Sequence, residues 1–177
     1  MTRWMRRTVM GAGMVCMAAG GFAQNTTGQS DNLVATKTDW SVFTEEKPKE
    51  CWGVSSPKQT VNSRDGKPVS VKRSDILLFV TFRPGQAGGE TSFTGGYPFA
   101  GGSMVELNVD GTKYDLVADG EWAWAANTDD DAKVLAALKK GGSAVLTAHS
   151  AKGTQTQDTF SLRGFTAAMT EAGTRCK

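Results

Sequence analysis

Short runs rich in apolar and β-branched residues recur along the chain, separated by glycine, proline and charged residues. Residues 40–43 and 51–54 are two such runs, and the charged stretch around Pro48 between them predicts a surface turn that joins adjacent strands. The most apolar run, residues 76–82, predicts a central strand buried on both faces, because nearly every position in it is apolar. A further strand is expected over residues 90–94.

The clearest turn in the second half of the chain is Asp110-Gly111, which lies between the runs at 104–109 and 112–117. Asp and Gly tolerate positive φ at both positions of a two-residue turn, so this pair predicts a hairpin with a defined register. Two more strands are predicted over residues 143–150 and 156–162.

Two segments have helical periodicity. The first covers residues 129–140, with Thr128 as the N-cap, acids in the first turn and two lysines in the last. Gly141-Gly142 is expected to end this helix in a left-handed conformation. The second is a short amphipathic helix near the C-terminus, where apolar residues recur at helical spacing. Its apolar residues are Phe165, Ala168, Met169 and Ala172.

The number and spacing of these elements indicate the fold class. About nine short strands, two short helices and frequent glycines predict an all-β fold, either an antiparallel sandwich or a closed barrel. Residues 37–177 are expected to form this single domain, which is large enough for a core of its own. Residues 24–36 have little to bury, and we expect them to be a flexible lead-in.

Residues 1–23 have the three parts of a signal peptide. A basic segment without an acid is followed by an apolar run that contains Cys16, and small residues precede a predicted cut after Ala23. The apolar run is too short to span a bilayer, so no stable membrane span is expected in the mature form. The mature protein is therefore expected in the periplasm or at the cell surface or outside the cell. Arg6-Arg7 leaves both the general and the twin-arginine export routes open.

Removal of this leader changes the formal net charge from +2 to −1, because three arginines leave without an acid. Nucleic-acid binding requires clustered Lys and Arg, so we expect a near-neutral mature protein not to bind nucleic acid. The adjacent basic pairs Lys72-Arg73 and Lys139-Lys140 are interpreted as solvated surface.

Two cysteines remain after the leader, Cys51 and Cys176. In an oxidising compartment, an even pair without neighbouring His or Cys ligands predicts a disulfide, and two free buried thiols are the alternative. The bridge would close a loop of about 125 residues, for which chain entropy gives roughly 4 to 5 kcal/mol of stabilisation as an upper figure.

Signatures of catalysis and metal binding are weak. His149 is the only histidine, and Ser150 beside it points to the opposite face of a strand, so a Ser-His-Asp arrangement is not indicated. Asp129-Asp130-Asp131 lacks the spacing of a calcium loop, and charge compensation at a helix N-terminus explains it. Glu106 with Glu121 is one of many carboxylate pairs that could be proposed for a glycosidase. We therefore expect no catalytic residue, no metal and no cofactor.

Aromatic residues provide the most specific candidate for a binding surface. Trp122 and Trp124 are two apart in a predicted strand, so both indoles lie on one face and are either both buried or both accessible. Together with Tyr97 and Phe99, from a glycine-rich loop, they form a candidate surface for stacking on sugars or contacting a protein partner. The alternative is that these rings belong to the core.

Several short motifs occur together across most of the mature chain. They are Asp39-Trp40, Cys51, Arg83-Pro84, Gly95-Gly96-Tyr97-Pro98-Phe99, Asp110-Gly111, Ser161-Leu162-x-Gly164-Phe165-x-x-Ala168 and Cys176. With this combination the chain resembles the invasion-associated locus B family of exported proteobacterial proteins. The resemblance implies an immunoglobulin-like antiparallel β-sandwich with added elements, a paired-cysteine framework, and delivery to the periplasm or cell surface. It also implies that Trp40 and the Ser-Leu-x-Gly-Phe segment belong to the scaffold.

We therefore predict an exported, non-enzymatic β-sandwich protein that binds a protein or an envelope component, and the family's name adds a link to host-cell or surface interaction. Two alternatives stay open. The first is a carbohydrate-binding module that uses Trp122, Trp124 and Tyr97. The second is a cell-wall hydrolase, which would need a cleft with two carboxylates within about 10 Å of one another.

Overall fold

A computed structural model describes residues 32–177, which contain twelve strands and two helices. The expected signal peptide and residues 24–31 of the expected lead-in lie outside the described residues. The strands are β1 (Leu33–Lys37), β2 (Trp40–Glu46), β3 (Lys49–Ser55), β4 (Gln59–Arg64), β5 (Lys67–Pro68), β6 (Leu77–Phe82), β7 (Glu90–Thr94), β8 (Met104–Val109), β9 (Thr112–Asp119), β10 (Trp122–Trp124), β11 (Ser143–His149) and β12 (Gln155–Ser161). The helices are α1 (Thr128–Lys140) and α2 (Phe165–Arg175).

Ordered structure begins earlier than we expected from the sequence. We placed the start of the domain near Lys37, whereas β1 starts at Leu33 and pairs antiparallel with β2. Val34 and Ala35 pack partly against the core. The hydrogen bonds of the β ladder and this apolar contact therefore order a segment whose composition alone did not indicate a strand.

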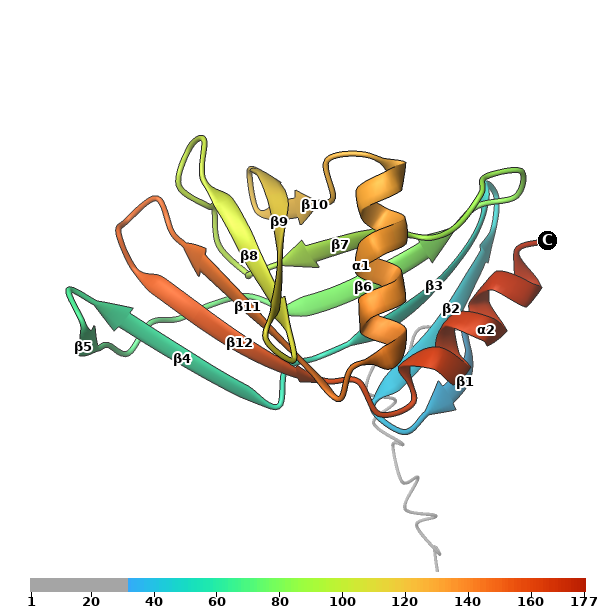
Figure 1. The fold of residues 1–177 in the computed structure, drawn as a ribbon, viewed down its shortest axis with the longest axis horizontal. Coiled ribbons are helices and arrows are strands. Elements are labelled where there is room, and N and C mark those ends of the chain that lie inside the picture. The colour runs from blue at the N-terminus through green and yellow to red at the C-terminus, as the bar shows by residue number, and fades with distance from the viewer. Residues whose placement is uncertain (1–31) are drawn as a thin grey trace, which may run out of the picture.

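All twelve strands belong to one antiparallel sheet, with the order β1-β2-β3-β6-β7-β10-β9-β8-β11-β12-β4-β5. The sheet bends over on itself, so that Phe93 of β7 meets Phe160 of β12 edge to face, with ring centroids 6.2 Å apart. Figure 1 shows strands β1 to β3 at one end of the molecule and the β4–β5 hairpin at the other. The all-β class and an open sandwich-like architecture are confirmed, and the layers of this sandwich belong to one continuous sheet.

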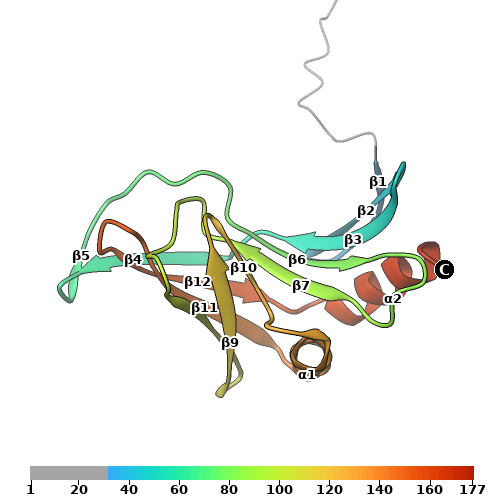
Figure 2. The ribbon, with the colours of Figure 1, turned by 90° about the horizontal axis from the view of Figure 1, so that it is seen from above.

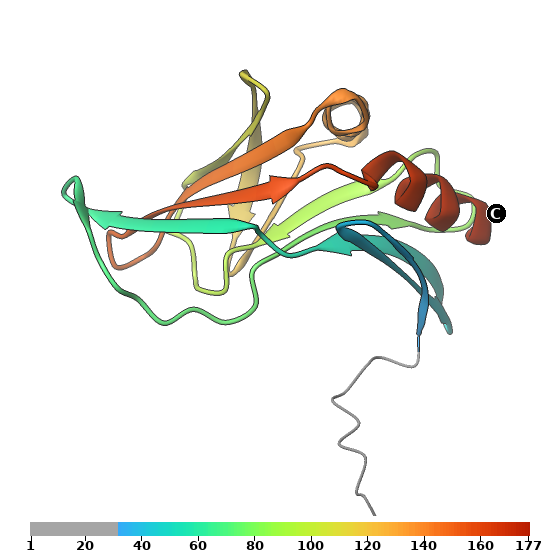
Figure 3. The same cartoon turned by 90° about the horizontal axis from the view of Figure 1, so that it is seen from below.

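Both helices cover buried side chains of the sheet. The Trp40 ring on β2 packs edge to face on Phe165 of α2, with ring centroids 4.8 Å apart. Gly53 on β3 faces α2, and a Cβ there would meet the flexible end of the Met169 side chain beside the Trp40 ring. The buried residues of α1 are Val134, Leu135 and Leu138. Figures 2 and 3 show both helices on the opposite side of the molecule from the connection between β5 and β6.

The hairpin predicted at Asp110-Gly111 is confirmed. Asp110 and Gly111 have φ values of 45° and 98°, and β8 and β9 pair across them from Val109 opposite Thr112 onward. The prediction for β6 is right about the strand and wrong about its burial. Leu78 and Val80 are fully buried, whereas Phe79 between them is only partly buried because it lies on the outer face of the sheet.

Both ends of α1 differ from the prediction. Asn127, not Thr128, is the N-cap, and its side-chain Oδ1 accepts hydrogen bonds from the backbone N–H groups of Asp129 and Asp130. Asn and Thr are both good capping residues, so two neighbouring candidates were hard to separate by type. Gly141 ends the helix with φ −78° and ψ 160°, which is extended and not left-handed.

The predicted disulfide between Cys51 and Cys176 is confirmed. The Cα atoms of the two residues are 5.7 Å apart, and both side chains are buried. Cys51 lies on β3 and Cys176 follows the last residue of α2. The bridge therefore fastens the C-terminal helix to the sheet that it covers.

Candidate functional site

A continuous row of side chains crosses the outer face of the sheet. The register pairs Met104 of β8 with Val117 of β9, and Val117 with Trp124 of β10. Trp124 pairs with Ser92 of β7, which in turn pairs with Phe79 of β6. Directly paired residues in adjacent antiparallel strands project from the same face, so these side chains are neighbours in space.

Trp122 joins this row from the same strand as Trp124. The two indole rings are nearly parallel, with centroids 6.4 Å apart, and Trp122 also contacts the Phe79 ring at 5.7 Å. We call Phe79, Met104, Val117, Trp122 and Trp124 the outer aromatic face. The alternate residue on the strand, Ala123, points to the opposite side and is fully buried.

This face is exposed to solvent. Within residues 32–177, four large apolar side chains are classed as exposed, and three of them belong to the outer aromatic face: Met104 at 45%, Val117 at 42% and Trp122 at 39%. Trp124 and Phe79 are partly buried beside them. Scattered exposed apolar residues are normal on a protein surface, whereas a contiguous group marks a candidate interaction site.

The other two rings predicted for the binding surface lie elsewhere. Phe99 is buried, with only 6% of its surface exposed, and its ring packs on Phe93 at a centroid distance of 6.0 Å. Tyr97 is half-buried and meets Phe99 edge to face at 5.3 Å. The expectation that Trp122 and Trp124 share one face is met, but the structure does not bring Tyr97 and Phe99 to that face.

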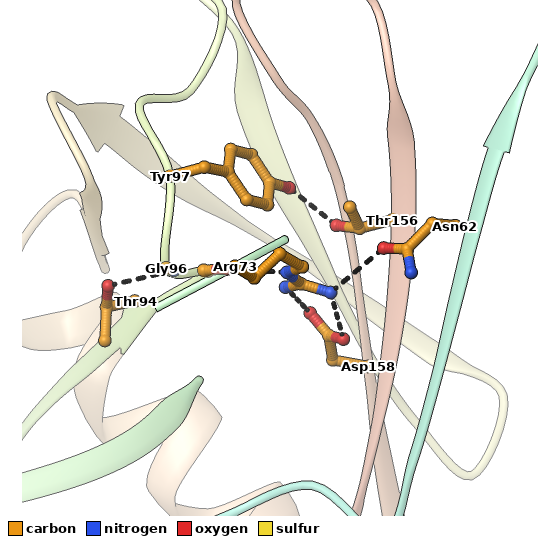
Figure 4. Close-up of polar contacts among 8 residues, drawn as sticks. Asn62, Arg73, Thr94, Gly96, Tyr97, Thr156 and Asp158 are labelled. Atoms are coloured by element: carbon orange, nitrogen blue, oxygen red, sulfur yellow. Dashed lines mark hydrogen bonds and ion pairs between the residues drawn. The ribbon is translucent and has the colours of Figure 1, made fainter. Parts of the chain in front are cut away.

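Tyr97 belongs to a polar network centred on Arg73, which lies in the connection between β5 and β6 (Figure 4). The buried carboxylate of Asp158, on β12, accepts two hydrogen bonds from the Arg73 guanidinium at 2.5 and 2.8 Å. Arg73 also donates to the Gly95 carbonyl at 2.8 Å and to the Asn62 side-chain oxygen at 3.3 Å. The guanidinium lies 5.1 Å from the Tyr97 ring centroid, a cation–π distance. Arg73 therefore links β4, β12 and the segment after β7.

This network corrects our interpretation of Lys72-Arg73 as solvated surface. The Arg73 side chain is only 6% exposed, and that of Asp158 is fully buried. Burial raises the pKa of the Asp158 carboxyl, and the Arg73 guanidinium acts in the opposite direction. Burial also raises the pKa of Tyr97, whose hydroxyl shares a 2.6 Å hydrogen bond with Thr156. Only Lys72 of the pair is exposed.

Two carboxylates, those of Glu90 and Asp131, line part of a cavity of about 260 Å³. Burial raises the pKa of Asp131, and the neighbouring Glu90 acts in the same direction. Both carboxylates already have partners, since Asp131 accepts the Thr91 backbone N–H at 2.7 Å and Glu90 accepts from Arg83 at 3.1 Å. This pair therefore anchors α1 and the start of β7.

The remaining candidates from the sequence occupy separate places. His149 is exposed at the end of β11. Glu106 on β8 forms an ion pair with Lys113 at 2.9 Å, and Glu121 is exposed in the turn between β9 and β10. No group of three or more His, Cys, Asp or Glu in the described part of the chain could hold a metal ion. Over the same residues, no helix is both long enough and apolar enough to cross a membrane.

Trp40 and the segment that precedes α2 are parts of one structural unit. The Trp40 indole N–H donates to the Ser161 carbonyl at 2.9 Å, and the ring is fully buried. Gly164 has φ 88°, and a Cβ there would lie 1.9 Å from the Lys37 carbonyl oxygen. Only glycine therefore fits between β1 and the start of α2.

Three residues of the outer aromatic face, Phe79, Met104 and Val117, were absent from the sequence-based candidates. The signal that could have found two of them is the Asp110-Gly111 hairpin. Its register places Met104 opposite Val117, with Leu107 and Leu116 on the buried face. Phe79 could not be assigned in this way, because the loop 83–89 between β6 and β7 is not a two-residue turn that fixes the register, and its ring partner Trp122 is far along the chain.

Comparison with known proteins gives one family. The model of the invasion associated locus B (IalB) protein family matches residues 40–173. Among solved structures, the crystal structure of invasion associated protein B from Bartonella henselae is similar, with a TM-score of 0.55 and 18% identity over 79% of this chain and 95% of that chain. At this identity the likeness shows a shared fold. No protein with a curated description matches. Because the family model covers most of the chain, from Trp40 to Gly173 within α2, this protein belongs to the invasion associated locus B family.

Proposed function

We propose that this protein is an exported, non-enzymatic binding module, and that its outer aromatic face binds a protein partner at the cell envelope or on a host surface. The observation that carries the proposal is the exposure of Met104, Val117 and Trp122 side by side on one sheet face. Membership of a family named for invasion supports a role in interaction. The disulfide is compatible with an oxidising compartment outside the cytoplasm.

The composition of the face favours a protein over a sugar. Trp and Met are enriched at the centres of protein interfaces, where aromatic side chains supply most of the binding energy. Sugar platforms combine a flat ring with polar groups that bind hydroxyls. The residues paired with the two indoles are Val117, the buried Ser92 and Thr94, and the exposed Asp119, and Phe79 contacts Trp122. Asp119 is thus a polar group beside a face whose exposed side chains, Met104, Val117 and Trp122, are apolar.

The chain provides a matched control for a test of this face. Val117 on β9 and Val61 on β4 are exposed strand valines with almost equal accessibility, 42% and 43%. Val117→Glu places a charge in the middle of the outer aromatic face, and Val61→Glu places the same charge on a different strand. Both substitutions are on the surface, so we expect both variants to keep the wild-type unfolding temperature within a few degrees.

The experiment is capture from a solubilised envelope fraction with immobilised mature protein, followed by quantitative mass spectrometry. We expect one protein species to be retained by the wild type and by Val61→Glu, and to be depleted about tenfold by Val117→Glu, since an unpaired charge at an interface core is costly. Equal retention by both variants would reject the outer aromatic face as the binding surface. The export component is checked by N-terminal sequencing, which should begin at Gln24.

The carbohydrate-binding alternative predicts a different result. If the two indoles stack on sugars, Trp fluorescence will change on titration with neutral envelope glycans, and Val117→Glu will reduce that change. If fluorescence does not change across the panel, this alternative is rejected.

A further inference from the structure

A second candidate site lies apart from the outer aromatic face. A pocket of about 410 Å³ is lined by four segments: the end of β4, the connection between β5 and β6, the start of the loop after β7, and the turn between β11 and β12 with the start of β12. Its volume lies in the range of small-molecule sites. None of the residues of the outer aromatic face lines it. A ligand at this pocket is therefore a question separate from the proposed protein partner.

The charge of the pocket is one-sided. Arg64, Lys72, Arg73 and Lys152 line it, and no acidic residue does. Arg73 is neutralised by Asp158, whereas the other three cations form no ion pair in the described part of the chain. These three come from different segments of the chain, so the fold brings together positive charge that the near-neutral composition does not indicate. Such a set favours an anionic ligand.

One wall of the pocket is aromatic and held in place. Arg73 lies over the Tyr97 ring, Phe99 packs against it edge to face at 5.3 Å, and the Tyr97 hydroxyl is bonded to Thr156. Pro98 and Val71 extend this apolar wall. A ring fixed by its neighbours loses little conformational entropy when a ligand packs on it.

Hydroxyl groups complete the lining. Ser150, Thr154 and Thr156 line the pocket, and the Thr154 hydroxyl accepts a 2.8 Å hydrogen bond from Arg64. Thr154 and Thr156 are buried and already hydrogen-bonded, whereas Ser150 is partly exposed. The rigid apolar wall, the Ser150 hydroxyl and the cations without an ion pair together match a sugar ring that carries a strong anion: the ring packs on Tyr97 and Pro98, and the anion meets the cations. An inorganic anion would use only the cations, and a neutral sugar would leave them unused.

We propose that this pocket binds an anionic saccharide, a sugar ring that bears a phosphate or sulfate group. Lys72 and Lys152 contact the anion, and Tyr97 with Pro98 forms the platform for the ring. Phosphorylated envelope sugars and sulfated glycans of a host share this chemistry, and the experiment below separates these two sources.

The test is isothermal titration of the mature protein with four probes: N-acetylglucosamine 6-phosphate, N-acetylglucosamine 6-sulfate, neutral N-acetylglucosamine, and inorganic phosphate. We expect one of the two charged sugars to bind at least about tenfold more tightly than both the neutral sugar and inorganic phosphate, since ring and anion each add contacts. Preference for the phosphate identifies an envelope-type sugar, and preference for the sulfate identifies a sulfated glycan. If inorganic phosphate binds as tightly as either charged sugar, or if no probe binds, the proposal is overturned.

The site is assigned with charge-matched variants. Lys72→Gln with Lys152→Gln removes two exposed lysines of the pocket, and Lys139→Gln with Lys140→Gln removes two exposed lysines at the end of α1. We expect the first pair to weaken binding of the charged sugar about tenfold or more, because hydrogen bonds to charged groups are lost, and the second pair to leave it unchanged. Equal weakening by both pairs would show attraction by net charge alone and would overturn the site. The Val117→Glu variant of the outer aromatic face should bind the charged sugar as the wild type does, which would show that the pocket is separate from the proposed protein-binding surface.

Discussion

The pair between Arg73 and Asp158 allows a quantitative test of the fold. Arg73 contributes four hydrogen bonds, two of them to a carboxylate that is fully buried. Arg73→Met keeps an unbranched apolar side chain and removes every one of these bonds. The Asp158 carboxylate is then left in the interior without a cation, and the Gly95 carbonyl loses its donor.

The expected cost follows from this geometry. Removing one partner of a buried ion pair costs about 3 to 5 kcal/mol, which is a large part of the stability of about 5 to 15 kcal/mol typical of a domain. We expect Arg73→Met to lower the free energy of unfolding by about 3 kcal/mol or more. Arg73→Lys should lower it by less, because a lysine keeps the charge but cannot make the bidentate contact.

Urea unfolding followed by circular dichroism measures both variants at neutral pH, and Asp158→Asn with the double variant completes a double-mutant cycle. The loss in the double variant should be clearly smaller than the sum of the single losses, because each single variant leaves one charge buried without its partner. NMR titration of Arg73→Lys should also show a pKa of Asp158 above the wild-type value. A lysine cannot make the bidentate contact, so it counteracts the effect of burial on this pKa less than the arginine does. If Arg73→Met costs less than about 1 kcal/mol, or if the losses add, the pair does not hold the two parts of the sheet together.

Three further predictions concern other parts of the scaffold. Cys51→Ser with Cys176→Ser should lower the free energy of unfolding by up to roughly 5 kcal/mol, measured by urea unfolding, because the bridge closes a loop of 125 residues. A variant as stable as the oxidised wild type would contradict this. Asn127→Ala should cost about 1 kcal/mol in the same assay, whereas Thr128→Ala should cost less, since only Asn127 caps α1. Hydrogen bonds from the Gly142 and Ser143 backbone lower the pKa of Asp110 in the folded protein. The ionised carboxylate therefore stabilises the fold at pH values above the pKa of Asp110 in the unfolded chain. This contribution is lost as the pH falls through the lower pKa of the folded state. Asp110→Asn should therefore lose less stability than the wild type on acidification, and equal pH profiles would refute the assignment.

Local signals in the sequence predicted the parts of the fold that depend on neighbours along the chain. The β8–β9 hairpin follows from Asp110-Gly111, because both residues adopt positive φ with little strain. The apolar spacing in α2 is also local, and its residues Phe165 and Met169 are buried as expected. The disulfide was predictable without geometry, since only two cysteines lie outside the predicted signal peptide.

Features that depend on distant residues were not predictable in this way. Arg73 was predicted to be solvated, because its partner Asp158 lies 85 positions away on β12 and no local pattern links the two residues. Phe79 was assigned to a strand buried on both faces, because a continuous apolar run does not tell whether one face is open to solvent. The candidate set also combined rings from two surfaces, because aromatic residue type alone does not tell that Trp122 lies on the exposed sheet face and Tyr97 beside Arg73 and Thr156.

Contact between the outer aromatic face and a protein partner can be tested directly by site-specific photo-crosslinking in the living bacterium. A photoreactive benzoylphenylalanine at Val117 reports on this face, and the same residue at Val61, with nearly equal exposure, is the control. We expect a discrete protein adduct at position 117 and none of that mass at position 61. Adducts of the same mass and yield at both positions, or no adduct at position 117, would contradict it.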